Sequence, residues 1–157
     1  MQRIDLGEIE NDEILEASGI ASSRFNQNIL WTHNDSGDEN RIFAMDINGN
    51  HIGEFFLNDT ENRDWEDIAI GPGPMEGVDY IFIGDIGDNR SENDVKRLYR
   101  FAEPQVSMEN QSSVINIDFC TNKVLDQWSE ALTLLIFLCN LGLRKIKQFR
   151  WVIPPTI

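Results

Sequence analysis

The chain repeats one ordered set of motifs at an interval of about fifty residues, and this repeat restricts its fold more than any other feature. Ala21 and Ala69 are 48 residues apart, and Asp35 and Asp85 are 50 residues apart. In each copy an acidic residue precedes an apolar stretch, an Asp-x-Gly-Asp motif follows the next stretch, and an Arg-aliphatic-aromatic triplet comes third. Repeats of roughly 40–50 residues are typical of the blades of β-propellers.

Both copies contain four short stretches with the composition of β-strands. Each stretch is apolar or alternating, and Asn, Asp or Gly residues separate it from the next. The Asn48-Gly49 pair predicts a hairpin, because its tight turn requires positive φ angles that Asn and Gly tolerate. We therefore predict strands at residues 18–23, 29–33, 41–47 and 51–57 in the first copy, and at 67–70, 79–84, 97–101 and 113–119 in the second.

Four antiparallel strands per repeat make one propeller blade, and propellers close with about 4–8 such blades. The predicted fold class is therefore all-β, a partial β-propeller of about two blades with Trp31 and Trp65 in its core. A β-sandwich of eight strands is the structural alternative. Two blades alone would leave sheet faces and edges open, so we expect the repeated part by itself to be poorly stable.

Charge divides the chain into two parts. The 157 residues carry a net charge of -14, but residues 1–118 hold 25 acidic and 8 basic residues, whereas residues 119–157 hold 2 and 5. We therefore expect an incomplete propeller domain over 1–118 and a divergent, apolar and basic tail over 119–157. An acidic domain repels phosphate backbones, so nucleic acid is not expected as a partner, and cations or cationic small molecules are favoured.

The tail contains an apolar run from Ala131 to Leu143 in which only Thr133 and Asn140 are polar. At 13 residues it is shorter than the ~20 that a membrane-spanning helix needs. Its basic flank suits a helix on a membrane surface, and a core helix or a partner-binding helix is the alternative. A third hypothesis is that the tail is a frameshifted or fused reading of DNA that once encoded further blades. The N-terminus has no apolar signal core, so we expect the chain as given to stay in the cytoplasm.

Acidic residues gather at the strand ends that a blade would bring to one rim. The first strand of a blade leaves this rim and the second returns to it, so acids before the first strand and after the second converge there. Oxygen-rich sites of this kind suit Ca²⁺, which takes about six to eight oxygen ligands. The candidate metal ligands are Glu16, Asp35, Glu66, Asp67, Asp85, Asp88 and Asn89. Asp38 and Asp64 are expected at the same rim but are not among the candidate ligands.

Ordinary turn chemistry is the alternative interpretation of both Asp-x-Gly-Asp motifs, since Asp accepts nearby backbone N–H groups and Gly adopts positive φ. Neither motif has the sixth-position Gly and twelfth-position Glu of an EF-hand loop. The sequence also contains no phosphate-binding glycine loop and no Gly-x-Ser-x-Gly motif. His33 is the one weak candidate for a general base, and a structural role is the alternative for this histidine.

Five motifs in order resemble the N-terminal part of a largely uncharacterised group of bacterial-type β-propeller proteins. That group is similar to the six-bladed superfamily of calcium-dependent phosphotriesterases and gluconolactonases. The motifs are Glu16-Ala-Ser-Gly-Ile-Ala-Ser-Ser-Arg24, Leu30-Trp-Thr-His-Asn-Asp-Ser-Gly37, Asp64-Trp-Glu-Asp-Ile-Ala69, Gly84-Asp-Ile-Gly-Asp-Asn89 and Tyr99-Arg-Phe-Ala-Glu-Pro104. The resemblance implies a six-bladed propeller with a metal site at the mouth of its channel, and many relatives are exported. It matches Glu16 to the acid at the start of the first inner strand, and it ends where the tail begins.

Three classes of function follow from these expectations. The chain is part of a propeller whose intact parent is a metal-dependent hydrolase of esters, lactones or phosphoesters, or it is a non-catalytic binding module, or the tail attaches it to a membrane. Two blades lack most of a channel wall, so we expect this chain itself to be inactive even if its parent is an enzyme. Whether the chain is an enzyme stays open at this point.

Overall fold

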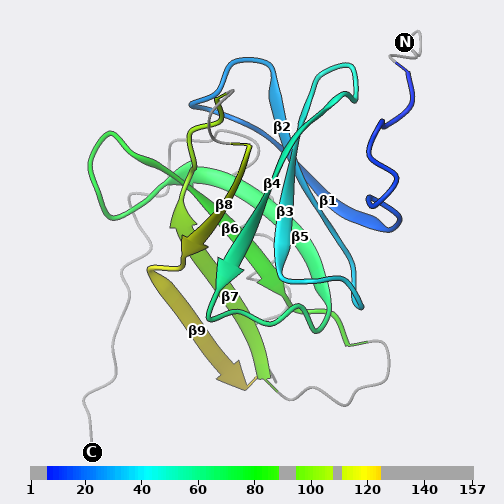
Figure 1. The fold of residues 1–157 in the computed structure, drawn as a ribbon. Helices are drawn as coiled ribbons and strands as arrows, with labels where there is room; N and C mark the ends of the chain where they lie inside the picture. Colours follow the sequence, from blue (N-terminus) through cyan, green and yellow to red (C-terminus); the bar gives the residue numbers. More distant parts are fainter. Residues whose placement is uncertain (1–6, 89–94, 108–110, 125–157) are drawn as a thin grey trace, which may run out of the picture.

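A computed structural model of the chain describes residues 7–88, 95–107 and 111–124. These residues form nine β-strands in two sheets and contain no helix, which confirms the predicted all-β class for this part of the chain (Figure 1). The strands are β1 Ala17–Ser22, β2 Ile29–Asn34, β3 Arg41–Asp46, β4 His51–Asn58, β5 Trp65–Pro72, β6 Asp79–Asp85, β7 Val95–Ala102, β8 Ser112–Asn116 and β9 Phe119–Val124.

Each sheet contains four strands in antiparallel order, of which β1 to β4 and β5 to β7 are joined consecutively, whereas β9 reaches the second sheet only after β8 has crossed to the first. The first sheet has the order β1-β2-β3-β4-β8, and the second has the order β5-β6-β7-β9. β3 pairs with β4, which confirms the hairpin predicted at Asn48-Gly49, although of these two residues only Gly49 has a positive φ, of 89°. The Asp46 carboxylate accepts the N–H groups of Asn48 and Asn50 and holds this turn closed.

The predicted single strand at 113–119 is wrong. β8 leaves the second repeat and pairs in parallel with β4 of the first sheet, from Glu54↔Ser112 to Asn58↔Asn116. β9 instead supplies the fourth strand of the second sheet by antiparallel pairing with β7. The physical reason is that β4 would otherwise expose a row of unpaired backbone groups, which β8 satisfies while Ile115 packs against the core.

A crossover segment carries the chain from β7 to β8, and Glu103 anchors it. The Glu103 carboxylate accepts hydrogen bonds from Ser23 Oγ, from the backbone N–H groups of residues 24 and 25 at 3.3 Å, and from Trp31 Nε1 at 3.0 Å. Asn26 adds a bond to the Pro104 carbonyl. The end of the second repeat is thus fixed to the β1–β2 hairpin of the first.

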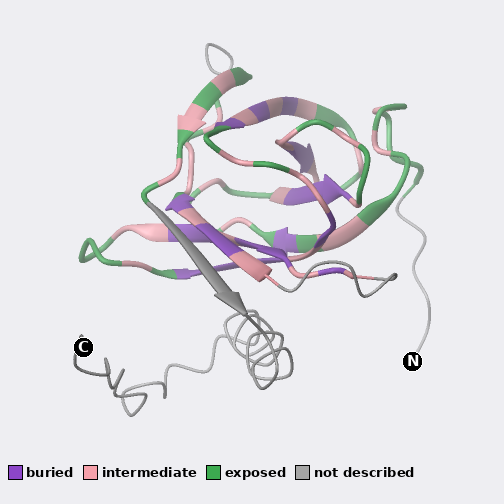
Figure 2. Cartoon of the chain, turned by 90° about the horizontal axis from the view of Figure 1, so that it is seen from below, coloured by how far each residue is buried: buried purple, intermediate pink, exposed green. Residues whose placement is uncertain are grey.

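The main core lies between the two sheets. It is formed by fully buried aromatic and aliphatic side chains from both repeats, and the buried strand centres are visible in Figure 2. Trp31 and Trp65 are both 0% exposed, as predicted, and Trp31 packs edge-on against Phe55 with ring centroids 5.4 Å apart. Burial of such large side chains supplies much of the free energy that holds the sheets together.

The inner strands β1 and β5 form a close seam between the repeats. Ser18 Oγ donates a 2.6 Å hydrogen bond to the Trp65 carbonyl. A Cβ atom on Gly19 would lie 2.9 Å from the backbone nitrogen of Ile68 and 3.0 Å from His33 Nε2, so only glycine permits this approach. The two repeats therefore pack as one body rather than as separate units.

The second sheet continues through β9 beyond the boundary predicted at residue 118. The helix considered for the tail and its possible membrane contact fall on residues 125–157, which lie outside the described part of the chain. Among the residues that the structure describes, none belongs to a helix that could cross a bilayer.

Candidate metal-binding site

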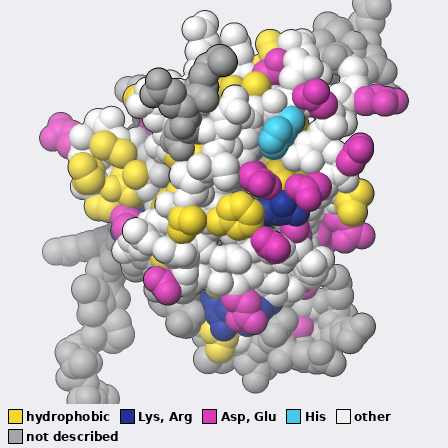
Figure 3. All heavy atoms as spheres, viewed as in Figure 1, with side chains coloured by type: hydrophobic (Ala, Val, Ile, Leu, Met, Phe, Trp, Pro, Cys, Tyr) yellow, Lys and Arg dark blue, Asp and Glu magenta, His cyan; other side chains and the backbone are white. Residues whose placement is uncertain are grey.

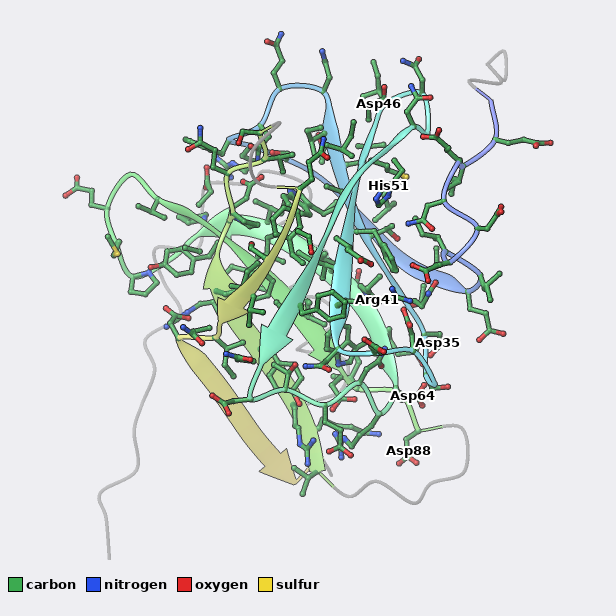
Figure 4. The ribbon with its side chains drawn as sticks, in the orientation of Figure 1. Asp35, Arg41, Asp46, His51, Asp64 and Asp88 are labelled. Carbon is green, nitrogen blue, oxygen red and sulfur yellow. The ribbon has the colours of Figure 1, made fainter. Side chains whose placement is uncertain are left out.

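Three carboxylates from the two repeats meet at one end of the sheets. Single carboxylate oxygens of Asp35, Asp64 and Glu66 all lie within 4.8 Å of one another. Asp35 follows β2 directly, whereas Asp64 immediately precedes β5 and Glu66 is its second residue. Figure 4 places Asp35 and Asp64 at the same end of the molecule, opposite the end that carries Asp46. We call Asp35, Asp64 and Glu66 the acidic triad.

A β-bulge and one connecting side chain position the triad. Asp64 and Glu66 flank Trp65, whose side chain is buried in the core, and Glu66 is the extra residue of the bulge between Trp65 and Asp67. Asn62 Nδ2 donates to the Asp35 carbonyl at 2.9 Å, and Asn62 Oδ1 accepts the Trp65 N–H at 3.3 Å. Asn62 therefore fixes the loop after β2 against the start of β5.

Burial and repulsion between carboxylates raise the pKa of two members of the triad, Asp64 and Glu66. The pKa of Asp64, which is only 8% exposed, is raised to about 6 by burial and by the adjacent Asp35 carboxyl, with further contributions from Glu66 and Asp85. Burial and Asp35 also raise the pKa of Glu66, while Lys96 partly offsets that shift. The three groups thus form a site of concentrated negative charge that a bound cation would relieve.

Gly87 makes the close approach of these carboxylates possible. A Cβ atom at this position would overlap the carboxyl carbon of Asp64 and would lie 2.6 Å from Glu66 Oε1. The Gly87 N–H donates to the Asp64 carbonyl at 3.0 Å, and its own carbonyl accepts from Lys96 Nζ at 3.3 Å. The loop after β6 therefore closes one side of the triad with backbone alone.

The structure brings two of the predicted metal ligands, Asp35 and Glu66, into the triad. Glu16 is exposed and is not a member, although its carbonyl accepts the Asp35 N–H at 2.9 Å. Asp67 is also outside the triad, and its carboxylate accepts the N–H of the next residue at 2.8 Å. Asp88 forms an ion pair with Lys96 at 3.2 Å. The predicted ligand Asn89 lies outside the described residues.

Asp85, another predicted ligand, has protein partners for both carboxylate oxygens. It is 1% exposed, one oxygen accepts from Arg63 Nε at 2.7 Å, and the other accepts the Asp64 N–H at 3.0 Å. Its counterpart in the first repeat is Asn34, whose side-chain oxygen accepts the Glu16 N–H at 3.2 Å. The strand registers agree, since Ala17 pairs with Asn34 and Trp65 with Asp85, each followed by a bulge.

The alignment of the two repeats that matches Asp35 to Asp85 therefore differs from the structural equivalence by one residue. Asn34 and Asp85 occupy the last position of β2 and of β6, and Asp35 lies one residue further along. Asp35 therefore lies in the loop that follows β2, whereas Asp85 is still paired within the sheet, with Trp65. This difference explains why Asp35 joins the triad and Asp85 does not.

The sequence predicts Asp64 at the acidic rim but not as a metal ligand, and its position beside Trp65 is the signal that identifies it. In Asp64-Trp65-Glu66 a large apolar residue separates two acids. When the tryptophan side chain is buried in the core, the two flanking carboxylates lie close together outside it. This pattern indicates the triad residues better than the two Asp-x-Gly-Asp motifs do.

His33, the weak catalytic candidate, is fully buried at the seam between the repeats. It is 0% exposed, its ring lies edge-on to Trp65 with centroids 5.7 Å apart, and its Nδ1 contacts Ser18 Oγ at 3.2 Å and the Asn34 carbonyl at 3.0 Å. Burial lowers the pKa of His33, which favours the neutral ring. Its position corresponds to the structural alternative considered for this residue.

A second acidic region lies on the face formed by the N-terminal segment and β4. It is a shallow hollow of about 460 Å³ lined by Glu10, Asn11, Asp12, Glu13, His51 and Glu54. Figure 3 shows acidic side chains gathered around a basic one on this face, and Arg41 binds both Glu13 and Glu54 at 2.9 Å. Glu10 accepts the His51 backbone N–H at 2.7 Å. Most of these carboxylates therefore already have protein partners, unlike a site arranged for a free cation.

Comparison of the chain with protein-family models, curated proteins and solved structures gives no match. The residues and their geometry alone therefore support an assignment of function.

Proposed function

We propose that the acidic triad is a Ca²⁺-binding site and that the two sheets are two blades of a β-propeller of the six-bladed kind. The observation that carries the proposal is the meeting of three carboxylates, from both repeats, within 4.8 Å at one end of the sheets. Like charges are not brought together in this way without a cost that a bound cation would offset.

The donor set fits a hard cation. All three side chains offer oxygen, and Ca²⁺ binds oxygen at about 2.3–2.6 Å, so ligands on opposite sides of the ion are roughly 5 Å apart. The spread of the triad oxygens is within that span. Three carboxylates supply up to six oxygens when bidentate, and backbone carbonyls or water complete the shell.

The propeller interpretation is supported by the internal symmetry of the two sheets. Both sheets contain four strands in antiparallel order, and the first strand of each carries a bulge at the equivalent place, before Gly19 and before Asp67. The first strands β1 and β5 lie against each other, as the inner strands of neighbouring blades do.

Binding rather than catalysis is the activity proposed for this chain. Hydrolysis would require a proton-transfer group within reach of a bound ligand, and His33 is sealed in the seam between Trp65 and Gly19. A metal-dependent hydrolase remains a proposal for an intact parent with more blades. For this chain the ligand is Ca²⁺ itself or a small molecule held through the ion.

Terbium luminescence tests the proposal, because Tb³⁺ replaces Ca²⁺ at oxygen sites and Trp65 lies between two triad ligands as an energy donor. We expect sensitised emission that Ca²⁺ displaces, and calorimetry should give one Ca²⁺ site per chain. Asp35→Asn, Asp64→Asn and Glu66→Gln should each weaken binding at least about tenfold, since each removes a charged ligand.

Asp59→Asn and Glu76→Gln are matched controls, because they remove the same charges from exposed residues outside the triad. They should leave the affinity within about twofold of the unsubstituted protein. Equal weakening by control and triad variants would mean that Ca²⁺ responds only to net charge, and absence of displaceable emission would refute the site.

A further inference from the structure

One face of the second sheet carries apolar side chains that do not belong to the main core. Ala69 on β5 pairs directly with Phe82 on β6, and Leu98 on β7 pairs with Gly84. Directly paired residues, and residues two positions apart along a strand, share one face of a sheet. Ala69, Phe82 and Leu98 therefore lie on one face, which we call the outer apolar face.

The outer apolar face is opposite the main core. Ile68, Ile83 and Tyr99 alternate with these residues along β5, β6 and β7, and all three belong to the core between the sheets. Ala69, Leu98 and Phe82 form a separate cluster. The same face also carries Arg100, which pairs directly with Phe82, and Lys96, two residues before Leu98. Both cations are in ion pairs, Arg100 with Asp118 and Lys96 with Asp88, so the apolar cluster lies at the centre of a face with charged residues around it.

Burial indicates that the outer apolar face is covered. Ala69 is 0% exposed and Leu98 is 8% exposed, although neither contributes to the core between the sheets. A small side chain on an open sheet face would remain accessible to water. Exposure of such a patch would also promote association.

The chain itself contains a segment whose position and composition suit it to cover the outer apolar face. β9 is the outer strand of this same sheet and ends at Val124, and residues 125–157 follow it directly. They include the apolar run 131–143 and, immediately after it, four basic residues among seven. Residues 1–118 hold 25 acidic and 8 basic residues, so the basic end of this segment and the rest of the chain carry opposite charge.

We propose that the apolar segment Ala131–Leu143 packs against the outer apolar face and covers it in place of a third blade. As a helix, thirteen residues would extend about 20 Å. Four strands spaced about 4.8 Å apart present a width of roughly 15–20 Å, so one such segment is long enough to cross the sheet. This proposal concerns a surface remote from the acidic triad and does not depend on cation binding.

Cys139 lies inside the apolar segment and makes the proposal testable in the full chain. In a Cys120→Ser background it is the single thiol. We expect Cys139 to react with a thiol reagent at least about 100-fold more slowly in the native protein than in denaturant, because labelling requires the segment to detach. Leu98→Glu, which places a charge on the outer apolar face, should accelerate labelling at least about tenfold.

Val114→Glu is the matched control, since Val114 is 61% exposed on β8 of the other sheet. It should leave the labelling rate unchanged. A cooperative thermal transition in each variant establishes that accelerated labelling reports detachment rather than global unfolding.

A disulfide test decides the matter even if Leu98→Glu does not fold. With Cys120→Ser, Phe82→Cys should form an intramolecular disulfide with Cys139 under mild oxidation, whereas Val114→Cys should not. Labelling of native Cys139 at the denatured rate would overturn the proposal, and so would protection without the disulfide. A disulfide-linked dimer would assign the face to a second copy of the chain. Protection of Cys139 seen only with phosphatidylserine vesicles would assign the segment to membranes. Either result also overturns the proposal.

Discussion

Replacement of Asp64 by asparagine should stabilise the protein when calcium is absent. The pKa of Asp64 is raised from 3.8 to about 6, chiefly by burial and by the neighbouring Asp35 carboxyl. A shift of about two units corresponds to roughly 3 kcal/mol against the charged form at a pH above both values. Asparagine keeps the shape, removes the charge and can donate to Asp35, so we expect the free energy of unfolding to rise by about 1–3 kcal/mol.

The pH dependence of this gain has a definite sign. Because the folded state binds the Asp64 proton more tightly than the unfolded state does, the contribution of Asp64 to stability is greatest below about pH 4 and declines as the pH rises to about 6. The advantage of Asp64→Asn should therefore be absent near pH 4, grow between about pH 4 and 6, and stay constant near pH 8.

Urea unfolding with a calcium chelator, repeated across this pH range, measures the effect. Asp59→Asn is the control, because Asp59 is exposed and its φ of 55° suits asparagine equally well. Calcium at about 100 times its dissociation constant should then add roughly 2.7 kcal/mol to the unsubstituted protein and little to the variant. A variant that is less stable than the unsubstituted protein near pH 8, or a gain that does not change with pH, would refute the account of the triad.

Three further predictions concern the seam, the crossover and the loop after β6. Glu103→Gln should lower the free energy of unfolding by about 2–4 kcal/mol in urea, because the Trp31 N–H and several other donors lose a charged acceptor; an unchanged midpoint would contradict the anchoring role. Gly87→Ala should leave the melting temperature within a few degrees but weaken terbium binding at least about tenfold, because the added methyl group displaces the Asp64 and Glu66 carboxylates. Unaltered terbium affinity would mean that the positions of these carboxylates do not matter for binding. Burial lowers the pKa of His33, so the free energy of unfolding should fall as the pH drops below about 6.5. His33→Gln should remove this part of the pH dependence in urea titrations, and an identical pH profile would exclude His33 as its source.

The strands of the first repeat could be predicted from the sequence because local signals agree with the fold. Alternation and turn residues located β1 to β4 within one or two residues, and the Asn48-Gly49 turn identified the hairpin. The end of the second repeat could not be predicted in the same way. Residues 112–116 alternate like any half-buried strand, and nothing local indicates that their partner is β4 rather than β7.

The acidic triad could be predicted only in part, for a reason of register. The spacing of the two Asp-x-Gly-Asp motifs suggested that Asp35 and Asp85 are equivalent, yet the ladders pair Asn34 and Asp85 in the same way. Motif similarity does not determine the register to one residue, although that one residue decides whether a side chain ends the strand or lies in the loop after it. Asp64 could be placed at the rim from the sequence but not assigned as a ligand, because its approach to Asp35 and Glu66 depends on the packing around the buried Trp65.

The parallel pairing of β8 with β4 has a consequence for synthesis on the ribosome. The first sheet can form its meander as soon as β4 has emerged, but its last ladder has to wait until residue 116 leaves the exit tunnel. During that interval the nascent chain displays a free strand edge beside a nearly complete sheet. Early termination within the second repeat would leave this edge permanently available to other chains, so truncated products should aggregate more readily than the full chain.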